Sequence, residues 1–170
     1  MGSSVLVGLV CLISAFVGSG PANATAVTAD PTARTSTTLT AGQFESRLFK
    51  RINTRRVNHG CRVFRSNSAL ELAAERHTSL MSYDSELSHL LPGEYDLGTR
   101  ITQAGYTQWR RLAENLAWGQ SSPRAVFRAW VRSAGHRANL DNCRLRDIGL
   151  GVLIRNGRPW VTADFGRRRT

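Results

Sequence analysis

The sequence is poor in lysine and in acidic residues. Lys50 is its only lysine, and 12 acidic residues stand against 23 basic ones, so the formal net charge is +11 at pH 7. This balance excludes an acidic disordered domain. The arginines are spread from Arg34 to Arg169 and form no basic face that alternates with aromatic residues. The pattern therefore favours a generally cationic surface over a nucleic-acid-binding one.

The low numbers of cysteine, proline and aromatic residues exclude further classes of protein. The chain has 3 cysteines, 5 prolines and 8% aromatic residues. The cysteines are too few for a small scaffold built on disulfides, and the composition is not that of a low-complexity chain. The apolar runs are too few and too short for a polytopic membrane protein. A length of 170 residues with 41% hydrophobic residues instead predicts one globular domain.

One apolar run near the N-terminus predicts export. Residues 5–17 (VLVGLVCLISAFV) carry no charge, and the small residues at 22–24 (Ala-Asn-Ala) offer a cleavage site. This arrangement is typical of a signal peptide over residues 1–24, with cleavage after Ala26 as an alternative. A single N-terminal membrane anchor is the competing interpretation, but the run is short for a bilayer span. We expect a secreted, extracellular protein without a stable transmembrane anchor.

The cysteine count fits an extracellular protein. Cys11 lies in the predicted signal peptide, which leaves Cys61 and Cys143. An even pair in an oxidising compartment predicts one disulfide. Two buried free thiols, or a pair of thiolates on a metal, are the alternatives, and the lack of a Cys-x-x-Cys motif disfavours the metal.

The rest of the chain divides into a leader, a domain and a tail. Residues 25–41 are rich in Thr, Ala and Ser and predict a flexible leader, residues 42–167 a single domain, and residues 168–170 a basic tail.

Apolar spacing and capping residues predict the elements of this domain. A first helix begins near Gly42 and stops at His59-Gly60. A second is capped by Ser68 and buries Leu72, Ala73, Leu80 and Met81. A short helix covers 97–104, and another runs from Ser122-Pro123 to Gly135. Residues 148–154 and 160–165 predict two strands joined by an Asn156-Gly157 hairpin turn.

Three side chains are candidates for chemistry. His89 lies in a serine-rich loop, Glu114 lies inside an apolar segment, and His136 follows Gly135. A carboxylate buried among apolar residues requires a partner. Two imidazoles and a carboxylate can also bind a first-row divalent metal. The separations match no compact metal motif, so the residues alone leave open whether the three share a site or are separate structural side chains.

Several blocks of the sequence are recognisable together. The most specific are residues 113–119 (AENLAWG) and 135–139 (GHRAN), preceded by Ser88-His89 and followed by residues 148–152 (IGLGV). Their order and spacing resemble the bacterial secreted CAP (SCP) domain, whose superfamily includes cysteine-rich secretory proteins, antigen 5 and plant pathogenesis-related proteins. The resemblance covers about residues 43–166.

The resemblance implies an α+β fold: a three-layer α-β-α sandwich with a small, mostly antiparallel sheet flanked by helices. It also implies a surface cleft in which His89 matches the family's Ser-His, Glu114 the acid of its Gly-Glu-Asn block, and His136 its Gly-His. Ala113 departs from the usual glycine. The fuller eukaryotic site has a second glutamate between the last two blocks, whereas residues 115–135 contain no Asp or Glu. The expected site is therefore a triad.

Two classes of function follow from the resemblance. The first is an extracellular binding module that presents the His/Glu cleft to a lipid or cell-wall ligand. Zinc or another divalent metal would be held there by His89 and His136, with Glu114 in the second shell or acting through water. The second is a metal-assisted hydrolase in which Glu114 is the base. The missing second acid and the absence of an HExxH motif disfavour this enzyme.

Charge and compartment set the expected partners. Outside the cell a chain of this charge meets anionic lipid head groups, wall polymers and acidic polysaccharides. We therefore expect a monomer that contacts an anionic surface, and we do not expect nucleic acid as a partner.

Overall fold

The computed structural model describes residues 39–169. The predicted signal peptide and most of the predicted leader lie outside these residues. The elements in chain order are α1 (Ala41–Asn58), β1 (Arg65–Ser66), α2 (Ser68–Asp84), α3 (Leu97–Gln103), β2 (Trp109–Trp118), α4 (Pro123–Arg132), α5 (Ala134–Asp141), β3 (Asp147–Arg155) and β4 (Arg158–Arg168).

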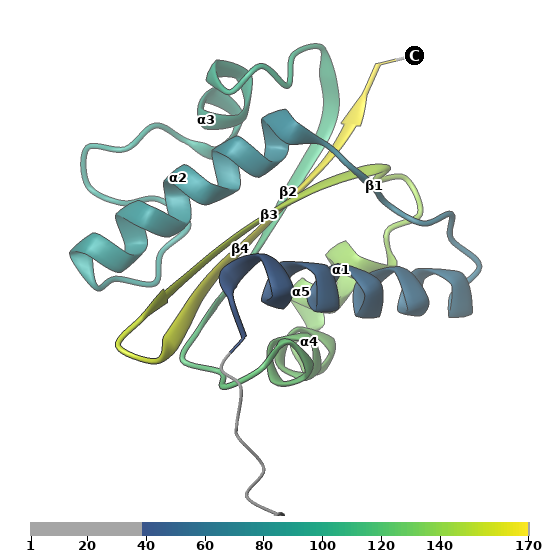
Figure 1. The fold of residues 1–170 in the computed structure, drawn as a ribbon. Coiled ribbons are helices and arrows are strands. Elements are labelled where there is room, and N and C mark those ends of the chain that lie inside the picture. Colours follow the sequence, from purple (N-terminus) through teal and green to yellow (C-terminus); the bar gives the residue numbers. More distant parts are fainter. Residues whose placement is uncertain (1–38, 170) are drawn as a thin grey trace, which may run out of the picture. The chain divides into compact units, whose positions relative to one another are not determined.

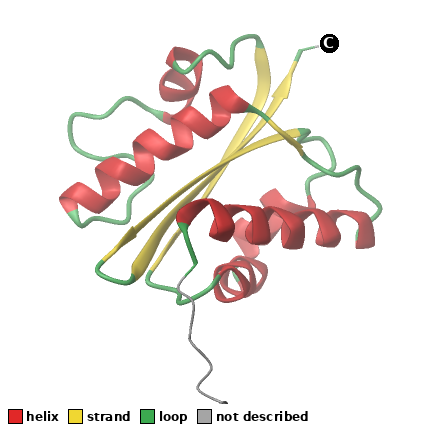
Figure 2. Cartoon of the chain, in the orientation of Figure 1, coloured by secondary structure: helices red, strands yellow, loops and turns green. Residues whose placement is uncertain are grey.

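A four-stranded sheet lies between two layers of helices (Figure 1, Figure 2). The strand order is β1-β3-β4-β2. Strand β1 pairs with β3 in parallel, and the other pairings are antiparallel. Helices α2 and α3 cover one face, and α1, α4 and α5 cover the other (Figure 1). This confirms the expected three-layer α+β sandwich. The sequence predicted β3 and β4 as strands, but neither the two-residue β1 nor β2.

The first two helices begin close to their predicted starts. Helix α1 begins at Ala41, where Thr40 and Gln43 form a reciprocal capping box, so the helix includes the last residue of the predicted leader. Helix α2 begins at Ser68, but its cap is Asn67, whose side chain accepts from two backbone N–H groups of the first turn. The Ser68 cap was therefore wrong by one residue.

The predicted helix over 122–135 is two helices. Ser122 caps α4 and Pro123 is its first residue, as expected. The helix ends at Arg132, because Ser133 takes an extended conformation and caps α5 by accepting from the His136 N–H. Gly135 therefore does not end a helix. It lies with His136 in the first turn of α5.

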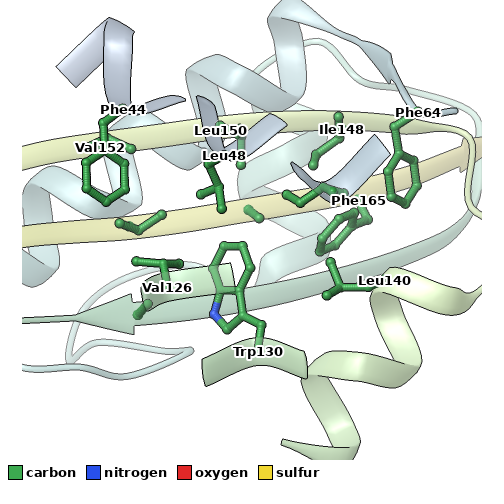
Figure 3. Close-up of a cluster of buried hydrophobic side chains, with 14 of the residues drawn as sticks. Phe44, Leu48, Phe64, Val126, Trp130, Leu140, Ile148, Leu150, Val152 and Phe165 are labelled. Carbon is green, nitrogen blue, oxygen red and sulfur yellow. The ribbon is translucent and has the colours of Figure 1, made fainter. Parts of the chain in front are cut away.

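The main core lies between the sheet and the α1/α4/α5 layer (Figure 3). Phe44, Leu48 and Ile52 recur every four residues on α1, and all three are buried. They meet side chains at alternate positions of the strands, such as Ile148 and Phe165. Burial of this apolar area is the main source of the domain's stability.

On the opposite face of the sheet, α2 lies unusually close to β3. A Cβ atom at Gly149 would lie 2.0 Å from the backbone of α2, and one at Gly151 would lie 2.5 Å from it. The backbone of α2 at residues 70–71 and at residues 74–75 therefore lies directly against β3. Leu72 and Leu80, which the sequence placed in the buried stripe, are 37% and 42% exposed.

A disulfide joins Cys61, after α1, to Cys143, after α5, with their Cα atoms 5.0 Å apart, which confirms the predicted pair. Beside it the buried guanidinium of Arg56 donates to four backbone carbonyls, of residues 62, 140, 142 and 145. These contacts fix the loop before β3. Within residues 39–169 no helix is long and apolar enough to cross a membrane.

Candidate functional site

His89 and Glu114 are in direct contact. His89 lies in the loop between α2 and α3, and Glu114 is on β2. The His89 Nδ1 lies 2.6 Å from Glu114 Oε1. The Glu114 carboxylate is buried, whereas the His89 side chain is 60% exposed. The hydrogen bond and charge of Glu114 raise the pKa of His89 despite partial burial.

Arg100 donates a hydrogen bond to the second carboxylate oxygen of Glu114. Its Nη2 donates to Glu114 Oε2 at 2.9 Å, and its Nη1 donates to Glu94 Oε1 at 3.0 Å. Burial alone would raise the pKa of Glu114, but the hydrogen bond from His89 and the charge of Arg100 outweigh it and hold the pKa below its usual range. Glu114 is thus an ionised acceptor with both oxygens engaged.

His77 completes this buried network from α2. Its Nδ1 lies 2.8 Å from Glu94 Oε1, and its Nε2 lies 3.0 Å from the carbonyl of Ser88. The His77 ring is thus held at both nitrogens, between Glu94 and the loop that carries His89. The guanidinium of Arg100 lies between the carboxylates of Glu94 and Glu114. The contact with the Ser88 carbonyl also holds the loop that carries His89.

Asp164 lies beside Glu114 on the neighbouring strand. The two residues are directly paired in the β2–β4 register, so their side chains share a face of the sheet. Asp164 is buried. Burial raises its pKa well above the usual range, and the charge of Glu114 adds to the effect. Asp164 is therefore the member of this carboxyl pair that keeps its proton to the higher pH.

His136 reaches the same region from α5. Asn115, next to Glu114 on β2, donates to the carbonyl of His136 at 3.1 Å. Asn139, one turn further along α5, donates to Asn115 Oδ1 and to the carbonyl of Glu114. These bonds fix the first turn of α5 against β2. Burial lowers the pKa of His136, and the nearby charge of His89 lowers it further.

The three residues predicted from the sequence therefore differ in their contacts. His89 and Glu114 form a pair, while His136 is placed near them through Asn115 and not through a side-chain bond to either. Within residues 39–169 no three His, Cys, Asp or Glu side chains form a preassembled metal-binding group. The side chains that could bind a divalent cation are the imidazoles of His89 and His136, because both oxygens of Glu114 already accept hydrogen bonds.

Four members of the network were not predicted as site residues: His77, Glu94, Arg100 and Asp164. His77 is buried on α2 with polar partners. Glu94 lies before β2, outside residues 115–135, in which the sequence shows no second acid.

Comparisons with known proteins agree with this fold and these blocks. The family model for CAP, the cysteine-rich secretory protein family, matches residues 49–164. The chain belongs to this family.

Individual relatives are distant. The uncharacterized protein YkwD of Bacillus subtilis is 27% identical over 138 residues, which are 79% of this chain and 53% of YkwD. The uncharacterized membrane protein YlbC of the same organism is 26% identical, and the match spans 34% of it. The chain thus spans about half of the first curated relative and a third of the second.

Solved structures show the same fold. An extracellular protein of Bacillus anthracis that contains an SCP domain superposes with a TM-score of 0.67 and 25% identity, over 76% of this chain and 44% of that one. An outer surface protein of Borrelia burgdorferi superposes with a TM-score of 0.71 and 21% identity, over 77% and 97% of the two chains.

Proposed function

We propose that this CAP domain is an exported binding module in which His89 and His136 hold a divalent cation, zinc or a similar metal, and in which the ligand is a lipid. Export rests on the apolar run and cleavage signal of residues 1–24 and on the disulfide, which is typical of an oxidising compartment. Of the two solved structures, the Bacillus anthracis one is an extracellular protein and the Borrelia burgdorferi one is an outer surface protein.

The orientation of His89 carries the proposal for the cation. Glu114 holds Nδ1 at 2.6 Å, which leaves Nε2 as the free ring nitrogen on an exposed side chain. A carboxylate behind an imidazole in this way is the usual support of a metal-binding histidine. A bound divalent cation would keep coordination positions open to ligand oxygen atoms or water.

The same geometry disfavours the hydrolase. A general base must reach the water that it deprotonates, but Glu114 accepts from His89 on one oxygen and from Arg100 on the other. The carboxylate is also buried. In this arrangement Glu114 orients His89.

A groove between α1 and α4 supports a lipid as the ligand. Its volume is about 650 Å³, and Leu39, Pro123 and Phe127 supply an apolar lining. Basic side chains of α1 and α4 also line it, namely Arg47, Lys50, Arg51, Arg55 and Arg124. An apolar groove lined by cationic residues fits an amphiphile with an anionic head better than it fits a fully polar wall polymer.

Zinc titration calorimetry on the oxidised secreted protein tests the metal site. We expect one-to-one uptake that is abolished in His89→Ala and in His136→Ala. His59→Ala is the matched control, because His59 lies at the C-terminal end of α1 and is exposed. Unchanged uptake in all three variants, or no uptake by folded wild-type protein, would refute the cation site.

The lipid is tested separately by flotation with vesicles of phosphatidylglycerol and of phosphatidylcholine. Phe127→Glu places a charge in the apolar lining and should weaken binding at least tenfold. Val57→Glu is the control, because Val57 is 60% exposed and does not line the groove. Equal binding by the two variants and the wild type would contradict the groove as the lipid site.

A further inference from the structure

A second hollow is lined almost entirely by arginine. Its volume is about 300 Å³. We call it the arginine pocket and define it by Arg62, Arg65, Arg146, Asp147, Arg167 and Arg168. Five guanidinium groups thus surround one carboxylate. The pocket shares no lining residue with the α1–α4 groove and contains none of His89, Glu114 and His136.

Three separate segments build the pocket. Arg65 on β1 pairs with Asp147 on β3, and Asp147 pairs with Gly166 on β4. The adjacent residues Arg146 and Arg167 bring further charge to the same end of these strands. The clustering is therefore produced by strand pairing and not by a run of basic residues in the sequence.

Two buried side chains, Asp147 and Tyr106, each contact one of the arginines, whose own side chains are exposed. Asp147 is buried and accepts from the Tyr106 hydroxyl at 2.8 Å on one oxygen. Its other oxygen accepts from Arg65 at Nε and lies 2.8 Å from Arg65 Nη2. The guanidinium of Arg168 lies over the Tyr106 ring, 4.7 Å from its centroid. Arg65 and Arg168 are thus held in place, with donors left over for a ligand.

Gly166 makes room for this arrangement. A Cβ atom at this position would lie 2.5–2.6 Å from the ring and hydroxyl of Tyr106. Burial and the hydrogen bond to Asp147 raise the pKa of Tyr106 far above its usual value, so the hydroxyl remains a donor. The support of the pocket is therefore built into β4 itself.

The remaining charge has no partner in the described structure. Within residues 39–169 the side chains of Arg62, Arg146, Arg167 and Arg168 form no ion pair. Guanidinium groups gathered without counter-charge repel one another, and a bound anion would relieve that repulsion.

We propose that the arginine pocket binds a phosphate group, as a phosphate ester or diester. The planar forks of several guanidinium groups match the oxygens of a tetrahedral phosphate. The volume admits one or two phosphate groups. This site stands apart from the proposed cation and lipid sites and does not depend on them.

Calorimetry with inorganic pyrophosphate at low ionic strength tests the pocket. We expect saturable, one-to-one binding that is at least tenfold weaker in the double variant Arg62→Gln/Arg167→Gln, whose side chains support neither Asp147 nor Tyr106. The matched control is Arg76→Gln/Arg128→Gln, which removes the same charge from exposed positions on α2 and α4 and should bind within twofold of wild type.

If both double variants bind pyrophosphate equally weakly, net charge alone explains the binding and the proposed site is wrong. The absence of saturable binding would overturn the site as well. Glycerol 3-phosphate and vesicles with phosphatidylglycerol distinguish the source of the phosphate. Preference for the soluble ester indicates a small molecule or wall polymer, and preference for the vesicle indicates a lipid head group. In both cases the dependence on Arg62 and Arg167 must hold. His89→Ala should bind pyrophosphate normally, so failure of the cation site leaves this test intact.

Discussion

Replacing Glu114 by glutamine should destabilise the domain, because this carboxylate connects the buried network. The change keeps the size of the side chain but removes its charge. Arg100 and His77 are then left with Glu94 as their one carboxylate, and all three side chains are at most 8% exposed. Breaking a buried ion pair costs about 3–5 kcal/mol.

We expect about 3 kcal/mol, the lower end of that range, because Arg100 retains Glu94 at 3.0 Å. Urea denaturation at pH 7 measures the loss. Glu86→Gln, at an exposed position in the loop after α2, should change stability by less than about 0.5 kcal/mol. A loss below about 1 kcal/mol for Glu114→Gln would refute the view that the carboxylate connects the network.

The pH dependence gives a second check on Glu114. Its pKa is lowered by folding, so its contribution to stability is complete above the unfolded value of about 4.3 and is lost as the pH falls through the lower folded value. The difference between wild type and Glu114→Gln should therefore shrink in acid. A difference that stays constant down to pH 2 would show that lost packing, and not charge, is the cause.

Three further measurements test other parts of the structure. Burial raises the pKa of Asp164, so the stability of the wild type should fall by up to about 1.4 kcal/mol per pH unit as the pH rises from the unfolded value of about 3.9 towards that raised pKa. Asp164→Asn should flatten this slope, and an unchanged slope would contradict a raised pKa for Asp164. Because the pKa of His89 is raised, zinc affinity in calorimetry should fall about tenfold per pH unit below that pKa, and affinity independent of pH would exclude His89 as a ligand. Gly149→Ala places a Cβ 2.0 Å from the α2 backbone and should lower the free energy of unfolding by about 3 kcal/mol or more, measured by thermal unfolding. Gly42→Ala lies in open space on α1 and should raise it by up to about 1 kcal/mol. Similar stabilities of the two variants would refute the close approach of α2 to β3.

Local signals in the sequence predicted most of the fold. The Asn156-Gly157 turn has positive φ at both residues, which is the hairpin geometry that this dipeptide favours. The break between α4 and α5 was missed because Ser133 has no acidic residue or glutamine three positions later, so the capping box that marks a helix start is absent. The buried stripe of α2 was misassigned because the glycines that draw the helix onto β3 lie nearly 80 residues away.

The candidate site was only partly predictable. Glu114 stood out because it is an acid in an apolar segment, and the same argument applied to residues 160–165 would have marked Asp164. Arg100, Glu94 and His77 gave no such signal. They lie on a short helix, in a loop and on an amphipathic helix, where charged side chains are normally solvated. Their burial follows from the packing of α2, α3 and the loop between them around the carboxylate of Glu114.

The buried arginines of this fold differ from those of the arginine pocket, and the difference supports the pocket as a binding surface. Arg100 is buried between two carboxylates, and Arg56 is buried against four carbonyls. These two buried guanidinium groups are supplied with acceptors for most of their donors, Arg100 Nε being an exception, as the cost of burying a charge requires. In the arginine pocket the guanidinium groups are exposed or half-exposed and face a single carboxylate, which is occupied by Arg65 and Tyr106. Water can solvate the remaining donors there, and a phosphate would replace that water with acceptors in a matching geometry.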